Sequence, residues 1–116
     1  MTSTSLETLL SGKVALVTGA NSGIGKSIVE VMARRGAAVA INYRSHPEAT
    51  KAMVAAITGA GGQAIGVQAD IGQLDQLQRM VQQTIDHYGR IDVLVNNAGD
   101  RKSTRLNSSH SSVFVC

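Results

Sequence analysis

Cysteine and aromatic residues are almost absent from this sequence of 116 residues. Cys116 is the only cysteine, which excludes a disulfide within the chain and a metal site built from several thiolates. With no tryptophan, one phenylalanine and two tyrosines, any hydrophobic core must be aliphatic. No apolar run has the length needed to cross a membrane, and residues 1–12 lack the basic start and apolar centre of a secretory signal. We therefore expect a cytoplasmic protein without a membrane partner.

A strong excess of charge of one sign is also missing. The formal net charge is +3, but residues 1–99 contribute only +1, from eight basic and seven acidic side chains (8 − 7). The rest comes from residues 100–116. Because the larger segment is nearly neutral, the sequence argues against a nucleic-acid partner.

Buried strands and amphipathic helices alternate along the chain. Continuous apolar, β-branched runs predict strands at 13–18, 37–43, 63–69 and 92–96. Apolar residues at helical spacing, each series ended by glycine, predict a helix in each of the three intervals. Alternation of this kind is typical of an α/β protein with a doubly wound parallel sheet, the Rossmann architecture, here reaching only its fourth strand.

The helices also carry start signals and apolar stripes. Ser45 and Glu48 stand at the spacing of a capping box, with the serine accepting from first-turn N–H groups. The predicted core-facing residues of the first helix are Ile24, Ile28 and Val31 or Met32. Those of the third helix are Leu74, Leu77, Val81, Ile85 and Tyr88.

A glycine-rich turn, Gly19-Ala-Asn-Ser-Gly-Ile-Gly25, joins the first strand to the first helix. Glycines at this point let the backbone approach a pyrophosphate, and the helix N-terminus supplies free N–H groups and a positive dipole end. A tight turn without a ligand is the alternative. The surrounding strand–turn–helix context favours dinucleotide binding.

The spacing Gly-x-x-x-Gly-x-Gly, together with Asn96-Asn-Ala-Gly99 after the fourth strand, resembles the short-chain dehydrogenase/reductase family. Residues 41–45 and 89–99 look most like the sugar dehydrogenases and 3-oxoacyl-carrier-protein reductases of that family. The resemblance covers residues 13–99, all of the native-looking chain. It implies a nicotinamide cofactor and interconversion of a small-molecule carbonyl and an alcohol by hydride transfer.

The end of the second strand indicates which cofactor is bound. NAD-selecting enzymes usually place a carboxylate there to bind the ribose 2′-OH. By the family's spacing that position is Tyr43, and Arg44 and Ser45 follow it. A guanidinium can pair with a 2′-phosphate. The sequence therefore favours NADP over NAD, with a solvated loop charge as the alternative role for Arg44.

The resemblance assigns further cofactor contacts to the ends of the third and fourth strands. Asp70 would accept from the adenine amino group, with an N-cap of the next helix as the alternative, and Thr18 and Asn96 would tie two strand ends together. The complete set of expected cofactor-binding residues is Gly19, Asn21, Ser22, Gly23, Ile24, Gly25, Tyr43, Arg44, Ser45, Asp70, Ile71, Asn97, Ala98 and Gly99.

The family's catalytic tyrosine, followed four residues later by lysine, has no counterpart. Tyr43 is followed at that distance by Pro47, and Tyr88 by Asp92. We expect no catalytic residue and no metal site here, and assign neither role to the histidines His46 and His87. The chain would then be the inactive cofactor-binding part of a longer enzyme that is a homo-oligomer when complete. The alternatives are a non-catalytic NAD(P)-binding or redox-sensing module, and a structural scaffold.

Residues 100–116 break the pattern. The segment 100–110 resembles, over eleven codons, the translation of a common sequencing-library adapter. We therefore expect three parts: an N-terminal extension at 1–12, a dinucleotide-binding half-domain at 13–99 and a non-native tail at 100–116. If the tail takes no part in the fold, the fourth strand presents an open apolar edge, and the chain is insoluble or marginally folded.

Overall fold

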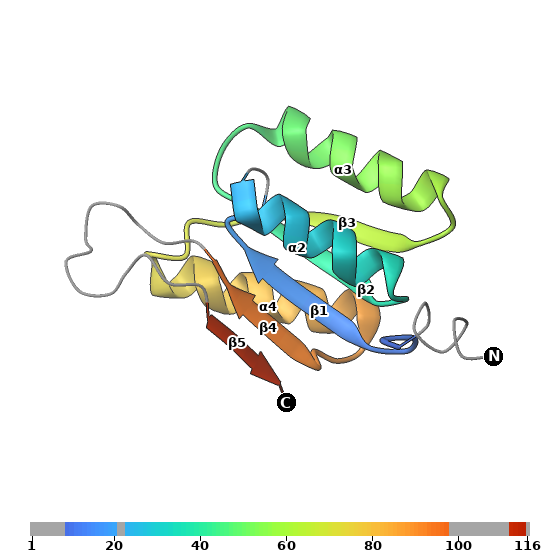
Figure 1. The fold of residues 1–116 in the computed structure, drawn as a ribbon. Helices are drawn as coiled ribbons and strands as arrows, with labels where there is room; N and C mark the ends of the chain where they lie inside the picture. The colour runs from blue at the N-terminus through green and yellow to red at the C-terminus, as the bar shows by residue number, and fades with distance from the viewer. Residues whose placement is uncertain (1–8, 21–22, 98–111, 116) are drawn as a thin grey trace.

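The computed structural model describes residues 9–20, 23–97 and 112–115 (Figure 1). Its sheet has the strand order β3-β2-β1-β4-β5, and all neighbours are parallel except β4 and β5. The strands are β1 (Val14–Thr18), β2 (Ala38–Tyr43), β3 (Gln63–Gln68), β4 (Val93–Asn96) and β5 (Ser112–Val115). The four parallel strands and their crossovers confirm the doubly wound Rossmann architecture.

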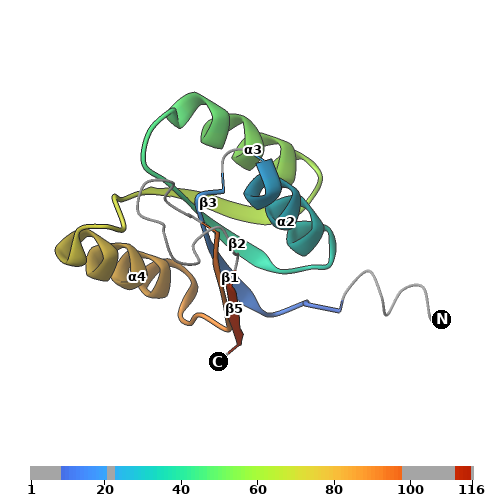
Figure 2. The same cartoon turned by 60° about the vertical axis from the view of Figure 1, so that its left-hand side comes forward.

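In the described ranges, three helices cover the sheet on both faces. They are α2 (Gly23–Arg34), α3 (Pro47–Gly59) and α4 (Leu74–Tyr88). Figure 2 shows α2 and α3 on one face and α4 on the other. The central strand β1 is buried along its whole length and contributes to both cores, with Ala15 and Val17 on the α2–α3 side and Leu16 on the α4 side. No helix in the described ranges is both long and apolar enough to pass through a bilayer.

The parallel strands end together at one edge of the sheet. Thr18 is paired with Asn96, and Tyr43 with Gln68. The segments that follow these four residues therefore start side by side at the carboxyl edge, which is where open α/β sheets bind their ligands.

The start of α3 differs from the prediction. Its N-cap is His46, which has a left-handed backbone (φ 62°, ψ 60°) and makes no side-chain capping hydrogen bond. Pro47 occupies the first turn, where its fixed φ suits the helix and its missing N–H costs nothing. The capping box predicted at Ser45 and Glu48 is therefore wrong, because the N-cap is His46 and the helix begins at Pro47, one residue later than a cap at Ser45 requires.

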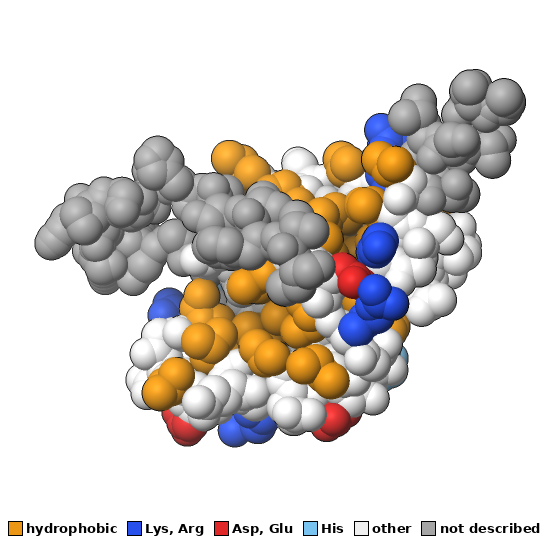
Figure 3. Space-filling model, turned by 90° about the horizontal axis from the view of Figure 1, so that it is seen from below, with side chains coloured by type: hydrophobic (Ala, Val, Ile, Leu, Met, Phe, Trp, Pro, Cys, Tyr) orange, Lys and Arg blue, Asp and Glu red, His pale blue; other side chains and the backbone are white. Residues whose placement is uncertain are grey.

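The buried face of α4 is narrower than its apolar stripe. Met80 and Thr84 are buried against the sheet, whereas the predicted core residues Leu74 and Ile85 are 67% and 37% exposed. Figure 3 shows hydrophobic side chains gathered on this side of the molecule. The prediction that Leu74 and Ile85 are buried is wrong. An apolar stripe shows which residues a helix is able to bury, and the other described residues cover only part of the stripe of α4.

The predicted face of α2 is confirmed at two of its three positions. Ile28 and Met32 pack against the core beside the buried Gly25 and Val29, so Met32 and not Val31 is the correct alternative. Ile24 is 67% exposed, and its predicted place in the core is wrong. Gly25 is the residue that faces the loop after β1, and apolar spacing alone could not identify it.

The edge of β4 is not open. Residues 112–115 form β5 and pair with β4 in register, Val93 with Val115 and Asn96 with Ser112. The expectation of an unpaired fourth strand is therefore wrong. An exposed strand edge is a template for any extended, apolar, β-branched segment, and the last residues of the chain provide one.

Candidate functional site

The glycine cradle consists of Gly19, Ala20 and Gly23–Gly25, the described residues at the two ends of the loop between β1 and α2. Gly19 has φ 58° and Gly23 has φ 62°, left-handed conformations that glycine adopts without strain. The helix that follows begins at Gly23 and has no acidic residue in its first turn. Its free N–H groups and positive dipole end are thus available to an anion such as a pyrophosphate.

Gly25 holds this cradle against the sheet. A Cβ atom at Gly25 would lie 2.6 Å from Asn97 Nδ2 and 2.8 Å from Ala20 Cα, and closer still to the carbonyl oxygen of Gly19. Such contacts are too short for any side chain. The third glycine of the motif is therefore needed for the packing of α2 on the loop.

The segment after β2 presents a cation to solvent at the same edge. Tyr43 is half-buried, and Arg44 and Ser45 are exposed. Gln68 Nε2 donates a hydrogen bond to the backbone oxygen of Arg44 at 3.3 Å, which ties this segment to β3. In the described part of the chain, the only ion pair is Arg90–Asp92, so the Arg44 guanidinium is available to an anionic ligand.

Asp70 follows β3 and shapes the turn before α4. Its Oδ1 accepts from the Gly72 N–H at 3.0 Å, and its backbone oxygen accepts from the Gln73 N–H at 2.9 Å. The N-cap of α4 is Gln73, which rules out the capping role considered for Asp70. Sequence reasoning missed Gln76, whose Oε1 accepts from the Asp70 N–H at 2.8 Å. Asp70 and Ile71 are therefore held half-buried at the carboxyl edge.

The end of β4 is tied to the end of β1. Thr18 Oγ1 donates to Asn96 Oδ1 at 3.1 Å and accepts from the Asn97 N–H at 2.9 Å. The expected structural role of Thr18 and Asn96 is thus confirmed. Asn97 also reaches back to the glycine loop, with Nδ2 donating to the Gly19 oxygen at 3.2 Å. The loop is anchored to β4 by this bond.

Asn42, which the sequence analysis did not select, anchors the loop from the other side. It is 2% exposed in the interior of β2. Its Nδ2 donates to the carbonyl oxygens of Val67 and Ala69, and its Oδ1 accepts from the Gly19 N–H. The signal was available in the sequence, because an asparagine inside the otherwise apolar run 37–43 must find partners when buried.

Ten of the predicted cofactor residues are thus brought to one edge of the sheet from four strand ends. They are Gly19, Gly23, Ile24, Gly25, Tyr43, Arg44, Ser45, Asp70, Ile71 and Asn97. Asn21, Ser22, Ala98 and Gly99 lie outside the described residues.

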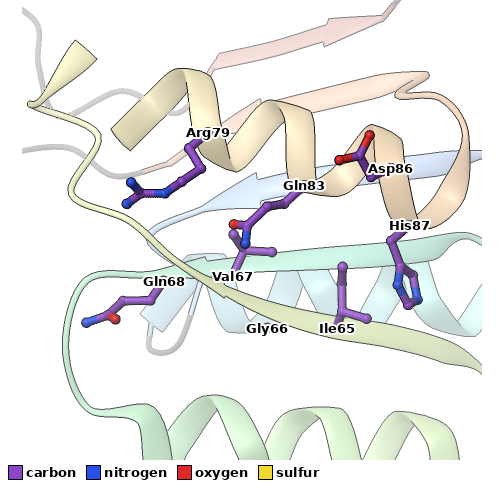
Figure 4. Close-up of a pocket in the computed structure, with 8 residues that line it drawn as sticks. All are labelled: Ile65, Gly66, Val67, Gln68, Arg79, Gln83, Asp86 and His87. Carbon is purple, nitrogen blue, oxygen red and sulfur yellow. The ribbon is translucent and has the colours of Figure 1, made fainter. Parts of the chain in front are cut away.

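A separate groove of about 670 Å³ lies between β3 and α4 (Figure 4). It is lined by Ile65, Gly66, Val67, Gln68, Arg79, Gln83, Asp86 and His87. None of these is a predicted cofactor residue. The polar side chains are exposed, and Asp86 is already bonded to Gln82 at 2.9 Å, which is typical of a solvated surface. The described residues include no cluster of histidine, cysteine or carboxylate side chains that could hold a metal ion.

The amino end of β4 carries the one salt bridge found among the described residues. The Val14 N–H donates to Asp92 Oδ2 at 2.9 Å, and the Arg90 guanidinium lies 2.7 Å from Oδ1. The pKa of Asp92 is held below its ordinary value, mainly by the hydrogen bond from the Val14 N–H and next by the hydrogen bond from the Arg90 side chain. Tyr88, at the end of α4, has a pKa raised by burial. Asp92 precedes β4 and Tyr88 ends the helix before it, so both lie away from the carboxyl edge and neither belongs to the candidate site.

Comparison with known proteins agrees with this geometry. A sequence profile described as short chain dehydrogenase matches residues 13–114. An uncharacterized oxidoreductase of Methylorubrum extorquens is 52% identical over 90 residues, 78% of this chain and 36% of the relative. A 3-oxoacyl-(acyl-carrier-protein) reductase of Synechocystis is 46% identical over 99 residues, 85% of this chain and 40% of that protein.

Solved structures match as well. A short chain dehydrogenase from Burkholderia cenocepacia in complex with NADP is 41% identical with a TM-score of 0.77, over 84% of this chain and 40% of that one. The chain belongs to the short-chain dehydrogenase family of oxidoreductases. It spans 36–40% of the length of these three relatives.

Proposed function

We propose that this chain is the N-terminal, cofactor-binding part of an NADP-dependent oxidoreductase that interconverts a carbonyl and an alcohol by hydride transfer. One observation carries the proposal: the glycine cradle and the exposed Arg44 lie at the same sheet edge. A dinucleotide with a 2′-phosphate needs both an anion site for its pyrophosphate and a cation for that phosphate. The NADP complex of the Burkholderia relative supports this choice.

Each group of residues has a distinct part in the proposal. The N–H groups of the loop at Gly19, Asn21 and Ser22, and of the helix start at Gly23–Gly25, bind the pyrophosphate. Arg44, with Tyr43 and Ser45 beside it, pairs with the 2′-phosphate. Asp70 and Ile71 bind the adenine, and 97–99 lie along the nicotinamide ribose. When bound, NADPH supplies the hydride, and this chain's residues bind and orient it.

Turnover requires more than this chain contains. Neither Tyr43 nor Tyr88 has a lysine four residues later, and Tyr88 lies away from the candidate site. The negative charge that develops on a carbonyl oxygen during hydride transfer must be met by a positioned acid. We propose that the 116-residue chain binds cofactor without turning over, and that the complete enzyme is a cytoplasmic homo-oligomer acting on a small molecule.

Titration of the chain with NADPH and NADH tests the proposal. Charge-assisted hydrogen bonds contribute about 1.5–3 kcal/mol each, so Arg44→Ala should weaken NADPH binding by about 10- to 100-fold. NADH affinity should not change. Arg34→Ala is the matched control, since Arg34 is an exposed arginine in the last turn of α2, at the opposite end of the helix from the cradle. Equal wild-type affinities for the two cofactors, or an unchanged NADPH preference in Arg44→Ala, would refute the choice of NADP.

A further inference from the structure

The Asn42 side chain bridges two segments that are not neighbours in the sequence. Its Oδ1 accepts from the Gly19 N–H at 3.4 Å, at the start of the glycine loop. Its Nδ2 donates to the carbonyl oxygens of Val67 at 3.3 Å and Ala69 at 3.2 Å, where β3 ends. The backbone oxygen of Asn42 accepts from Ala20 at 3.2 Å, so the contact to the loop is double.

The Asn42 side chain lies at the point where the pairing between β1 and β2 ends. The paired register of β1 and β2 ends at Val17 and Ile41, after which β1 turns away into the glycine loop. Asn42 is the next residue of β2 and is paired with Val67 of β3. A primary amide suits this position because it carries an acceptor and two donors on one short, rigid group. Leucine has a similar shape but neither function.

We infer that Asn42 is a positioning residue, one that sets the distance between the pyrophosphate loop and the adenine end of β3. The inference rests on the proposed function, because the two segments are those that would hold the two ends of a dinucleotide's ADP portion. At 2% exposure the side chain is covered by protein, and so it acts through Gly19 and Ala69. Its importance is therefore greatest for a ligand that must reach both segments at once.

A positioning role can be distinguished from a contribution to folding alone by comparing the affinities of a long ligand and of two shorter ones. NADPH spans the loop and the end of β3, whereas inorganic pyrophosphate reaches only the loop and adenosine 2′-phosphate only the adenine end. A half-ligand can follow its own segment if the segment shifts, but a spanning ligand cannot. Loss of folded protein alone would weaken all three ligands by the same factor.

The experiment is an NMR titration of wild-type chain and Asn42→Leu with these three probes. We expect NADPH affinity to fall about tenfold, as the loss of the hydrogen bonds of one side chain implies, and each half-ligand to change less than twofold. Thr84→Ala is the matched control. Thr84 is likewise buried and hydrogen-bonded, to the Met80 oxygen in α4, so its loss destabilises the fold without touching the site.

Asn42→Asp provides a second variant of the same size. The carboxylate can still accept from Gly19, but it cannot donate to Val67 or Ala69, so the bridge is broken on the β3 side only. The same selective loss of NADPH is expected. Equal losses for all three probes, or none, in both variants would overturn the inference and leave the proposed function intact. A wild-type chain that binds none of the probes would overturn both.

Discussion

Replacement of Gly25 by alanine is the most direct test of how the glycine cradle is built. The added Cβ would lie 2.6 Å from Asn97 Nδ2, 2.8 Å from Ala20 Cα and closer still to the Gly19 oxygen. Two of these three atoms belong to the backbone and cannot swing aside. Either α2 must move away from β1 or the loop must shift, and both displace the N–H groups proposed to bind the pyrophosphate.

The size of the effect follows from these contacts. Overpacking of a well-packed site costs about 1–3 kcal/mol. A shift of the loop also lengthens the bond from Asn97 Nδ2 to the Gly19 oxygen, now 3.2 Å, whose net contribution is about 1 kcal/mol. The free energy of unfolding should therefore fall by about 2–4 kcal/mol, and NADPH affinity should fall with it.

Urea denaturation measures the first effect and titration with NADPH the second. Gly59→Ala is the control, because Gly59 ends α3 without a left-handed backbone and has open space around its Cβ position. The same substitution there should leave stability unchanged or raise it by about 0.4–1 kcal/mol. If Gly25→Ala were as stable as the wild type, the packing argument would be refuted. Unchanged NADPH affinity in a destabilised variant would instead separate the packing from the binding site.

Two further predictions concern positions outside the cradle. Thr50→Val should raise the free energy of unfolding by about 1 kcal/mol, since the Thr50 hydroxyl is buried without a hydrogen-bond partner among the described residues; a decrease in urea denaturation would count against this. Asp92 has a lower pKa folded than unfolded, so between the two values the unfolded chain binds more protons, and stability should be lost as the pH falls below about 4. Asp92→Asn should be less stable at neutral pH and show a smaller acid loss in denaturation curves measured from pH 3 to 7, whereas an identical acid loss would show that other groups cause it.

The sequence predicted well those elements whose formation depends mainly on the residues within the element itself. The strands are continuous β-branched runs, and the structure places each of the four within a residue or two of its predicted bounds. The end of α4 at Gly89, which has φ 90°, follows from the need of a helix C-terminus for a left-handed residue. Parallel strand ends meet at one edge by topology, so the position of the candidate site followed from the order of the elements alone.

The predictions that failed depended on contacts between distant segments. In α2, Ile24 is exposed while Gly25 packs against Gly19, and no periodicity within the helix encodes that contact. Likewise, the apolar residues of α4 form a continuous stripe, but the sheet needs only the part around Met80 and Thr84. The sequence carries two start signals for α3, Ser45 and Pro47. The helix begins at Pro47, whose fixed φ suits the first turn, and the N-cap is therefore His46 and not Ser45.

Asn42 and β5 show what a linear pattern cannot express. Asn42 is a single polar residue in an apolar strand, and its partners Gly19 and Ala69 are separated from it by 23 and 27 positions. Only the folded register brings them within reach. The pairing of β5 with β4 is less specific than the contacts of Asn42, because an open strand edge can pair with any extended apolar segment whatever its origin. A strand at 112–115 is therefore compatible with a tail that took no part in the evolution of the fold. The hydrogen bonds of Asn42, in contrast, require one amide side chain at one position. Because of that requirement, they are stronger evidence for a functional site than the pairing of β5.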